Sequence, residues 1–299
     1  MMKIIGFLFV KINLAVALTL LLAVGSVNGQ TFPEGLAGLS SNNPAVLYSI
    51  DASNGTATPF VTLNGNAGIA GLSYIEETLY GTDLYGFPGA SGGFDIGSIS
   101  TGGIITFLGD QNGSSNWQGL ASDDCGENIL YALDIENNNI LTAQFPNGTV
   151  QTIGTGGNVQ FVGMAYDDLN EILYAIPRNG LLYTVSTVDG TSSLIGGSVI
   201  PQPIVSWGLA YDEDNSILYA NNGNTGELYT LNVTTGAATL VGSNNVVETV
   251  IDGLAWLDPC GPPPSPAMVP TLSEWGLIAM AGILGIVGFM VIRRKKVAA

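Results

Sequence analysis

Residues 208–212 read Gly-Leu-Ala-Tyr-Asp, and residues 163–167 repeat them as Gly-Met-Ala-Tyr-Asp. Weaker copies begin at Gly71, Gly119 and Gly253, so that successive glycines are separated by 48, 44, 45 and 45 residues. Internal similarity at a fixed period of this length is typical of architectures built from repeated units.

Each copy of the repeat carries further markers in the same order. About ten residues after the glycine comes a Leu-Tyr pair, as at Leu173 and Leu218, and a second pair follows at Leu182 and Leu228. A turn and a short apolar end complete the unit. Segments rich in Tyr, Val, Ile and Thr, separated by Gly, Asn and Asp, predict four short strands per repeat.

Four strands in every 45 or so residues are typical of a β-propeller blade. A single blade cannot bury both of its faces, so its neighbours have to cover them. We therefore predict an all-β fold over residues 30–260, a β-propeller of about five four-stranded blades. The strand at Gly253 has no partners after it, while residues 47–51 match the second half of a repeat. Joining the two ends would complete one blade from N- and C-terminal strands and leave no open edge.

Two alternatives to this architecture exist. Gly38-Leu39 can be interpreted as another blade start, which would give six blades, but Gly38 is too close to Leu47 to hold the missing strand pair. An open β-solenoid or sandwich is the second alternative. The repeats resemble the Tyr-rich Gly-Leu-Ala-Tyr-Asp propeller repeats of many bacterial exported proteins, over residues 47–258. Such motifs say little about ligands.

The N-terminal segment has the features of a secretion signal. Lys3 and Lys11 precede an apolar run at residues 12–24, and small and polar residues follow at 25–30. A run of about 13 apolar residues is shorter than the roughly 20 that span a bilayer. We therefore predict a signal peptide at residues 1–29, cleaved after Gly29, with an uncleaved anchor as the alternative.

The predicted exported domain is strongly acidic. Arg178 is its only basic residue, against 23 Asp and Glu between Glu34 and Asp258, which gives a net charge of −22. Nucleic acid is excluded as a partner, because phosphate backbones bind Lys and Arg. The chain has no histidine, the usual general base and transition-metal ligand. We expect no enzymatic activity, no cofactor and no metal.

Three acidic stretches are candidates for Ca²⁺: Asp123-Asp124, residues 167–170 and residues 212–215. Clustered carboxylates and amides supply the oxygen ligands that this ion takes. However, the stretches occupy the predicted turn after the first strand of each repeat, where Asp and Asn are favoured for backbone reasons. Turn chemistry is the preferred interpretation, and a Ca²⁺ site is the alternative.

The other candidate residues have similarly plain explanations. Arg178 suits carboxylate or phosphate, but Asn179-Gly180 after it predicts a tight turn. Tryptophans flank the Gly-Leu positions, where we expect packing between blades in preference to a sugar-binding groove: Trp117, Trp207 and Trp256. The sequons at Asn54 and Asn232 are interpreted as turns.

Two cysteines, Cys125 and Cys260, each follow a copy of the Gly-Leu-Ala motif. An oxidising compartment permits a disulfide between them. The sequence does not place their Cα atoms within bridging distance, so a disulfide and two unpaired thiols both stay open.

The C-terminal segment carries the most specific signal. A Pro-rich linker at residues 261–268 precedes Val-Pro-Thr-Leu-Ser-Glu-Trp-Gly, and an apolar stretch then reaches Ile292. A basic cluster after an apolar stretch predicts a transmembrane helix, at residues 276–292, whose end stays cytoplasmic. The segment 269–299 resembles the IPTL-CTERM sorting signal, Ile-Pro-Thr-Leu-x-x-Trp-Gly followed by a helix and an Arg-rich tail. The matching residues are Val269, Pro270, Thr271, Leu272, Trp275 and Gly276, and the basic tail is Arg293, Arg294, Lys295 and Lys296. Val269 replaces Ile and keeps an apolar β-branched side chain.

The resemblance implies recognition by an exosortase-type sorting peptidase in the envelope of a Gram-negative bacterium. From the N-terminal segment we also expect signal peptidase as a partner, which would remove residues 1–29 during export. An ordinary single-span anchor is the alternative. We expect a non-catalytic cell-surface or extracellular-matrix protein, held in the inner membrane before processing, whose propeller is a binding or structural module. A Ca²⁺-dependent carbohydrate-binding or lyase-type propeller that takes a polysaccharide, and an adhesin, are the other functions considered.

Overall fold

The computed structural model describes residues 31–40, 42, 44–64, 69–83, 96–108, 117–134, 140–144, 150–155, 159–196, 207–246 and 250–258. Within these residues all regular structure is β, in twenty strands that form five four-stranded antiparallel sheets. The predicted signal peptide, the Pro-rich linker, the sorting motif and the predicted transmembrane helix lie outside the described residues. None of the described segments is a helix with the length and apolarity that a bilayer crossing requires.

Four of the sheets are formed by strands that follow one another in the chain. Two of them consist of β4 (Ile69–Ile75), β5 (Thr78–Asp83), β6 (Ile96–Ile99) and β7 (Ile105–Phe107), and of β8 (Trp117–Asp123), β9 (Ile129–Asp134), β10 (Ile140–Gln144) and β11 (Val150–Thr155). The third consists of β12 (Phe161–Asp167), β13 (Ile172–Pro177), β14 (Leu182–Val185) and β15 (Ser192–Gly196). The fourth consists of β16 (Trp207–Asp212), β17 (Ile217–Asn222), β18 (Glu227–Leu231) and β19 (Ala238–Ser243). Each repeat predicted from the sequence is thus one sheet, and its Gly-Leu-Ala segment is the first strand.

The remaining sheet joins the two ends of the domain. β20 (Ile251–Leu257) pairs with β1 (Gly35–Ser40), followed by β2 (Val46–Ile50) and β3 (Ala57–Thr62). Gly38 therefore does not begin another blade. It lies in the second strand of this sheet, and a single N-terminal strand fills the position for which the sequence offered no candidate.

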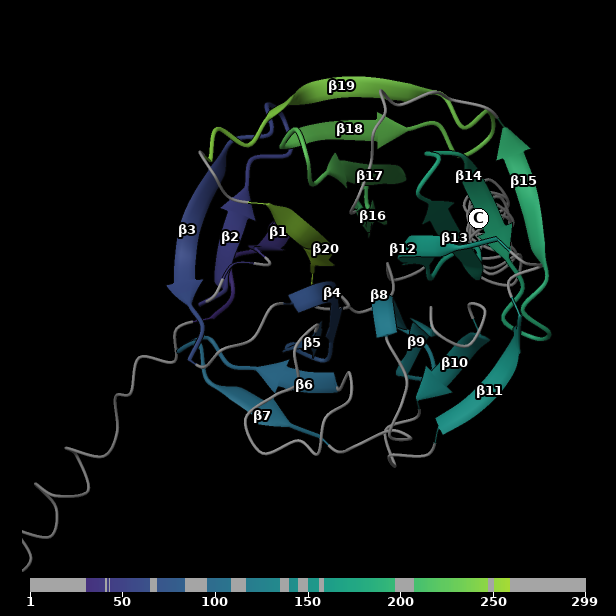
Figure 1. Ribbon diagram of the computed structural model, residues 1–299, viewed down its shortest axis with the longest axis horizontal. Helices are drawn as coiled ribbons and strands as arrows, with labels where there is room; N and C mark the ends of the chain where they lie inside the picture. The colour runs from purple at the N-terminus through teal and green to yellow at the C-terminus, as the bar shows by residue number, and fades with distance from the viewer. Residues whose placement is uncertain are drawn as a thin grey trace, which may run out of the picture. The chain divides into compact units, whose positions relative to one another are not determined.

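The sheets are arranged around a common centre in a propeller-like ring (Figure 1). The innermost strands follow one another in the order β4, β8, β12, β16 and β20, and β20 contacts β4 again. The outermost strands β3, β7, β11, β15 and β19 lie at the rim. The all-β, propeller-like fold predicted from the repeat is confirmed.

Glycines hold the innermost strands together. A Cβ atom added at Gly208 would lie 2.5 Å from the backbone N of Leu254, and one at Gly253 would lie 2.9 Å from Leu72 Cβ. A side chain at either position would push two innermost strands apart. The repeat requires glycine here because the strands converge on the centre of the ring.

A second set of glycines joins the sheets near the rim. Each of these glycines is the last or the last but one residue of an outermost strand. The turn between the third and fourth strands of the next sheet packs against it. The pairs are Gly154 with Asp189-Gly190, Gly196 with Thr235-Gly236, and Gly242 with Asn54-Gly55. The last pair joins the C-terminal repeat to the N-terminal sheet, so contacts of one kind continue around the ring.

Four of the five outermost strands also contain a β-bulge. In β15, Leu182 pairs with Gly196 and Tyr183 with Leu194, which leaves Ile195 without a pairing partner on β14. β3, β11 and β19 contain the same irregularity at Phe60, Ile153 and Val241. These four apolar side chains are half-buried against the core clusters between sheets. The short apolar end of the repeat thus turns an extra side chain inward.

Candidate functional site

The centre of the ring is filled by side chains. The residue after each inner glycine points to the axis, and the five of them are at most 2 % exposed: Leu72, Leu120, Met164, Leu209 and Leu254. The small gap that they and the neighbouring glycines line has no room for a water molecule. Among the described residues, the axis of the ring is therefore closely packed.

The acidic residues that end the innermost strands stabilise their own turns. Asp167 Oδ1 accepts a hydrogen bond from the backbone N of Asn170 at 3.0 Å, and Oδ2 accepts one from Asn170 Nδ2 at 2.9 Å. Asp212 and Asn215 make the equivalent bonds at 3.1 and 2.9 Å. Both aspartates are 1 % exposed. Their carboxylates serve turn formation, as the sequence predicted for these positions.

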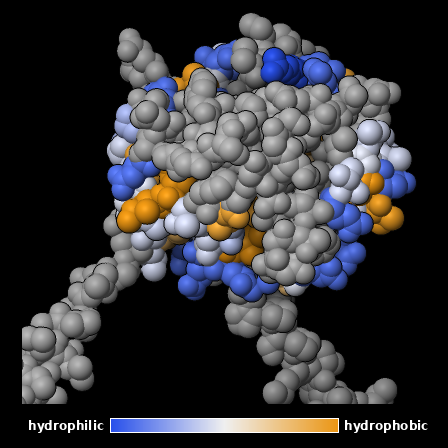
Figure 2. Space-filling model, turned by 60° about the horizontal axis from the view of Figure 1, so that its bottom comes forward, coloured by the Kyte–Doolittle hydropathy of each residue, from blue (hydrophilic) through white to orange (hydrophobic). Residues whose placement is uncertain are grey.

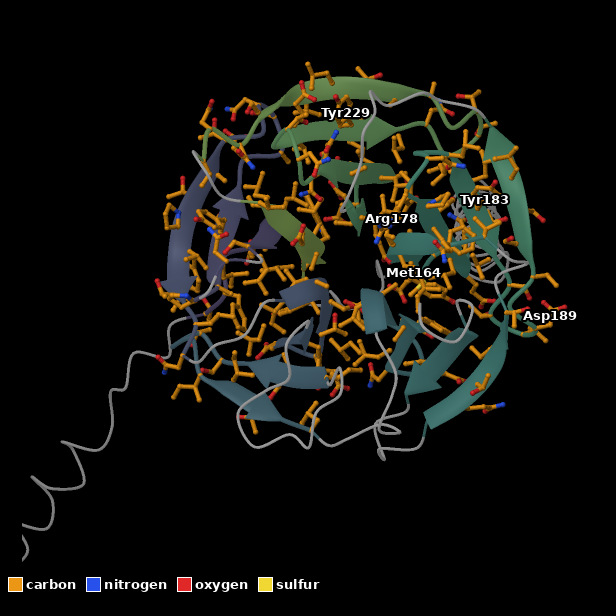
Figure 3. All side chains as sticks on the ribbon, in the orientation of Figure 1. Met164, Arg178, Tyr183, Asp189 and Tyr229 are labelled. Carbon is orange, nitrogen blue, oxygen red and sulfur yellow. The ribbon has the colours of Figure 1, made fainter. Side chains whose placement is uncertain are left out.

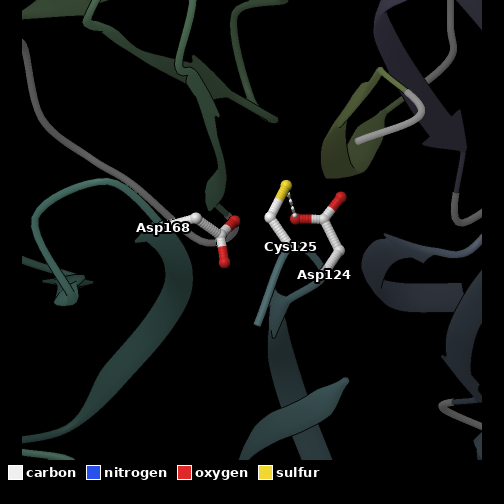
Figure 4. Close-up of side chains that lie close together, drawn as sticks. All are labelled: Asp124, Cys125 and Asp168. Carbon is white, nitrogen blue, oxygen red and sulfur yellow. Dashed lines mark hydrogen bonds between the residues drawn. The ribbon is translucent and has the colours of Figure 1, made fainter. Parts of the chain in front are cut away.

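Three other carboxylates from three adjacent sheets meet near the ends of the innermost strands. Asp124 follows β8, Asp168 follows β12 and Glu213 follows β16. Glu213 Oε1 accepts a hydrogen bond from the backbone N of Asp168 at 2.8 Å. A carboxylate oxygen of Asp168 lies within 4.8 Å of one of Asp124 (Figure 4). We call Asp124, Asp168 and Glu213 the acidic cluster.

Burial changes the protonation of the acidic cluster. Loss of hydration, followed by hydrogen bonds to Asp124 and Glu213, raises the pKa of Asp168 far above its usual range. Burial also raises the pKa of Asp124 to about 6, against an opposing effect of the hydrogen bond from Asp168. Asp168 Oδ1 is buried without a hydrogen-bond donor among the described residues. The direction of both pKa shifts favours the protonated form of these carboxyl groups, and most strongly that of Asp168.

Cys125 adjoins this cluster and is disulfide-bonded. Its Sγ lies 3.6 Å from Asp124 Oδ1 (Figure 4). A disulfide sulfur has no proton to donate, so we interpret this approach as a packing contact. It also lacks the thiolate charge that binds metals. Although Asp124, Cys125 and Asp168 lie together, the sulfur does not contribute a metal ligand. The other cysteine of the chain, Cys260, lies outside the described residues.

Arg178 lies in an exposed turn between β13 and β14. Gly180 donates its backbone N–H to the carbonyl of Pro177 at 2.9 Å, and its φ of 76° suits glycine. Asn179 Oδ1 accepts the backbone N–H of Leu181 at 3.1 Å. The tight turn predicted from Asn-Gly is confirmed. Figure 3 shows Arg178 and Met164 near the centre of the ring, and Asp189 at its rim.

Aromatic side chains connect adjacent sheets. Trp256 stacks on Tyr219 with ring centroids 5.8 Å apart and an angle of 2° between the planes. Tyr211 stacks in the same way on Tyr174, at 5.8 Å and 29°. The packing role predicted for Trp256 is confirmed. Trp117 and Trp207 begin β8 and β16, and their side chains lie outside what the structure describes.

The sequons at Asn54 and Asn232 form turns. Asn54 Oδ1 accepts the backbone N–H of Thr56 at 2.8 Å. Asn232 Oδ1 accepts those of Thr234 and Thr235 at 3.0 and 2.9 Å. The interpretation of both sequons as turns is confirmed.

Sequence reasoning identified the acidic stretches but did not bring them together. Their common position after the first strand was visible in the repeat. In a ring, equivalent positions of adjacent repeats are neighbours, and this was the available signal. Sequence reasoning also missed a hydrogen bond between Tyr211 and Asp167 of the preceding sheet. Burial is the larger cause of the raised pKa of Tyr211, and this hydrogen bond raises that pKa further.

In the part of the chain that the structure describes, six large apolar side chains are exposed: Ile104, Leu108, Leu169, Val188, Leu194 and Leu240. On the face in Figure 2, apolar atoms appear in separate groups between hydrophilic ones.

Comparison with solved structures supports the fold. A chain from "Crystal structure of Nidogen/Laminin Complex" aligns with a TM-score of 0.54 and 15% identity, over 76% of this chain and 100% of that one. A protein of unknown function from Bacteroides thetaiotaomicron gives 0.49 and 16%, over 76% and 64%. Glutaminyl cyclase from Myxococcus xanthus gives 0.42 and 19%, over 64% and 71%. At 15% identity, the likeness to the first of these chains concerns the fold alone.

Comparison of sequences supports the sorting signal. Curated proteins give no match to the chain. Residues 269–295 match the IPTL-CTERM motif, which implies export, processing by an exosortase-type enzyme and surface localisation in Gram-negative bacteria. The chain therefore combines an IPTL-CTERM motif with a propeller-like domain.

Proposed function

We propose that this chain is a non-catalytic cell-surface or extracellular-matrix protein of a Gram-negative bacterium, whose propeller is a binding or structural module. The match of residues 269–295 to the IPTL-CTERM motif carries the proposal. A domain net charge of −22 fits it, because such charge keeps a protein soluble and repels anionic surfaces.

The route of export follows from the two ends of the chain. Signal peptidase removes residues 1–29, and a helix at 276–292 holds the precursor in the inner membrane, with Arg293 to Lys296 in the cytoplasm. The sorting peptidase then recognises Val269 to Gly276 and cuts near them. These are substrate residues of that peptidase.

The domain itself is a closed propeller of five blades. The pairing of β20 with β1 and the contact of β20 with β4 support this. The filled axis supports a binding role on the faces or the rim in place of a central catalytic pocket.

Intact mass of the protein purified from the native envelope tests the sorting function. The expected mass lacks residues 1–29 and the tail from near the motif. A Thr271→Pro variant, which alters the motif without touching the domain, should keep the basic end. A wild-type mass that includes Arg293 to Lys296 contradicts the proposal.

The acidic cluster favours a second candidate function, a Ca²⁺-dependent carbohydrate-binding propeller. This function predicts that millimolar Ca²⁺ raises the melting temperature and that a glycan array binds only in its presence. Asp124→Asn should abolish both effects, whereas Asp189→Asn, in a turn at the rim, should leave them unchanged. Identical melting curves with Ca²⁺ and with a chelator exclude it.

A further inference from the structure

The outermost strand β7 differs from the other four. Its pairing with β6 has no register shift, whereas β3, β11, β15 and β19 each contain a β-bulge. An outermost strand has backbone groups without a partner strand in its sheet, and a bulge makes such an edge unfit for pairing with another chain. β7, at the rim of the ring in Figure 1, is therefore the one regular outer edge among the described strands.

The free backbone groups of β7 come from two residues. The carbonyl of Ile104 and the N–H of Leu108 are hydrogen-bonded on the β6 side, at 2.9 and 3.1 Å. Because the direction of bonding alternates along an antiparallel strand, Thr106 also bonds toward β6. The N–H and C=O groups of Ile105 and Phe107 therefore point away from the sheet, where a further strand would lie.

The residues around this edge are symmetric in chemical character. Residues 104–108 read Ile-Ile-Thr-Phe-Leu, with two apolar residues on each side of one threonine. Ile104, Thr106 and Leu108 share one face of the strand, and all three are exposed, Ile104 by 57 % and Leu108 by 43 %. Such a strand is complementary to a second copy of itself, turned by a two-fold axis through Thr106.

The charge of this edge also favours a second copy. Residues 96–108 contain no Asp, Glu, Lys or Arg, although the domain has a net charge of −22. Two copies that meet along this segment do not bring carboxylates of β6 and β7 together, so these strands add no repulsion to the contact. A cationic partner, which the acidic domain would attract, finds no carboxylate in this segment.

We propose that β7 is a docking edge for a second copy of this chain, with the two strands antiparallel about an axis at Thr106. Ile105 of each copy exchanges both backbone hydrogen bonds with Phe107 of the other, and Ile104 packs against Leu108 across the edge. The two sheets become one continuous sheet. Residues 104–108 are far fewer than the roughly 20–30 residues that each copy contributes to a standard interface, so the dimer forms only at high local concentration.

Two matched variants test the docking edge. Thr106→Asp places like charges opposite each other on the two-fold axis. Thr239→Asp is the control, because Thr239 is also exposed and has the equivalent position in the bulged strand β19. In sedimentation equilibrium of protein purified from the envelope, from about 1 μM to 1 mM, wild type should approach the dimer mass and not exceed it. Thr106→Asp should weaken dimerisation about tenfold or more, and Thr239→Asp by less than about threefold.

Hydrogen exchange and a cross-link identify the register of the dimer. The amides of Ile105 and Phe107 should exchange about tenfold more slowly at high than at low protein concentration, whereas the bonded amide of Leu108 should change little. Thr106→Cys should form a disulfide between copies faster than Thr239→Cys, because opposite residues at this position lie about 5 Å apart. Peptide mapping should locate the bond at residue 106 of both copies.

Three results overturn the docking edge. One is a wild-type protein that stays monomeric up to the highest concentration, and another is a dimer that Thr106→Asp leaves intact. The third is protection of the Ile105 and Phe107 amides in the monomer, which would assign the edge to a segment of the same chain. Melting temperatures of Thr106→Asp and Thr239→Asp close to that of wild type establish that a lost dimer is not a lost fold.

Discussion

Single residues of the repeat act between sheets as well as within them. The fourth residue of Gly-Leu-Ala-Tyr-Asp stacks on an aromatic ring of the preceding sheet at Tyr211 and Trp256. The residue at the same position in β8 is Ser122, which bonds to Ser73 Oγ at 2.7 Å instead. Between the sheets of β4 and β8, a polar contact thus takes the place of the ring contact.

Trp256→Ala should lower the free energy of unfolding by about 3 kcal/mol, because it removes the ring contact with Tyr219 and leaves a cavity between β20 and β17. Trp256→Phe should recover part of this loss, since it keeps an aromatic face. Denaturant unfolding followed by circular dichroism measures both. Equal stability of the alanine variant and wild type would contradict a packing role.

The acidic cluster makes stability depend on pH. Burial raises the pKa of Asp124 to about 6 and that of Asp168 further, so the folded domain binds protons that the unfolded chain has released. The contribution of these two groups to the free energy of unfolding is fully present below about pH 4. It is lost as the pH rises through their pKa values in the folded state.

Asp168→Asn keeps a hydrogen-bond donor toward Asp124 without an ionisable proton. It should raise the melting temperature at pH 8 by about 2–6 °C and flatten the decline of stability between pH 5 and 8. Asp189→Asn, in an exposed turn, is the control. A wild-type melting temperature that increases steadily from pH 5 to 8 would show that the cluster does not hold a proton.

At the scale of elements, the turn between the third and fourth strands is a joint between sheets. A Cβ atom at Gly196 would collide with the carbonyl oxygen of Thr235. Gly196→Ala should therefore cost about 1–3 kcal/mol of stability, since a backbone group has to move.

Gly102→Ala is the matched control for this joint. Its Cβ atom would come no closer than 3.8 Å to a neighbour, so stability should change by less than about 0.5 kcal/mol. Thermal unfolding compares the two variants. Similar melting temperatures would mean that the turn at Thr235 can move to accommodate the added methyl group without a loss of stability.

The repeat predicted most elements but not all of their partners. Leu-Tyr pairs and Gly, Asn and Asp turns located the first three strands of the regular repeats, because local chemistry determines them. β1 was missed as the second strand of its sheet: it reads Gly-Leu-Ala-Gly-Leu-Ser, without the Tyr of its equivalents, and its partner lies at the other end of the chain. The acidic cluster was missed for the same reason, since its members are distant in sequence and meet only in the ring.

At the scale of the whole molecule, the cysteines provide a check on export. Cys125 is disulfide-bonded, and Cys260 is the one other cysteine of the chain. We expect the two to pair in an oxidising compartment outside the cytoplasm. Non-reducing peptide mapping should find one peptide pair joined through these residues and no free thiol. A disulfide-linked dimer, seen on a non-reducing gel, would assign the Cys125 partner to a second copy.

Five outermost strands leave five rows of backbone amides and carbonyls facing outward. At the high local density of a cell surface, such rows would recruit strands of neighbouring copies and grow into fibres. The half-buried extra residue in β3, β11, β15 and β19 breaks the alternation that a pairing strand requires. These four edges should therefore resist pairing with strands of neighbouring copies, whereas the regular edge of β7 has no such protection.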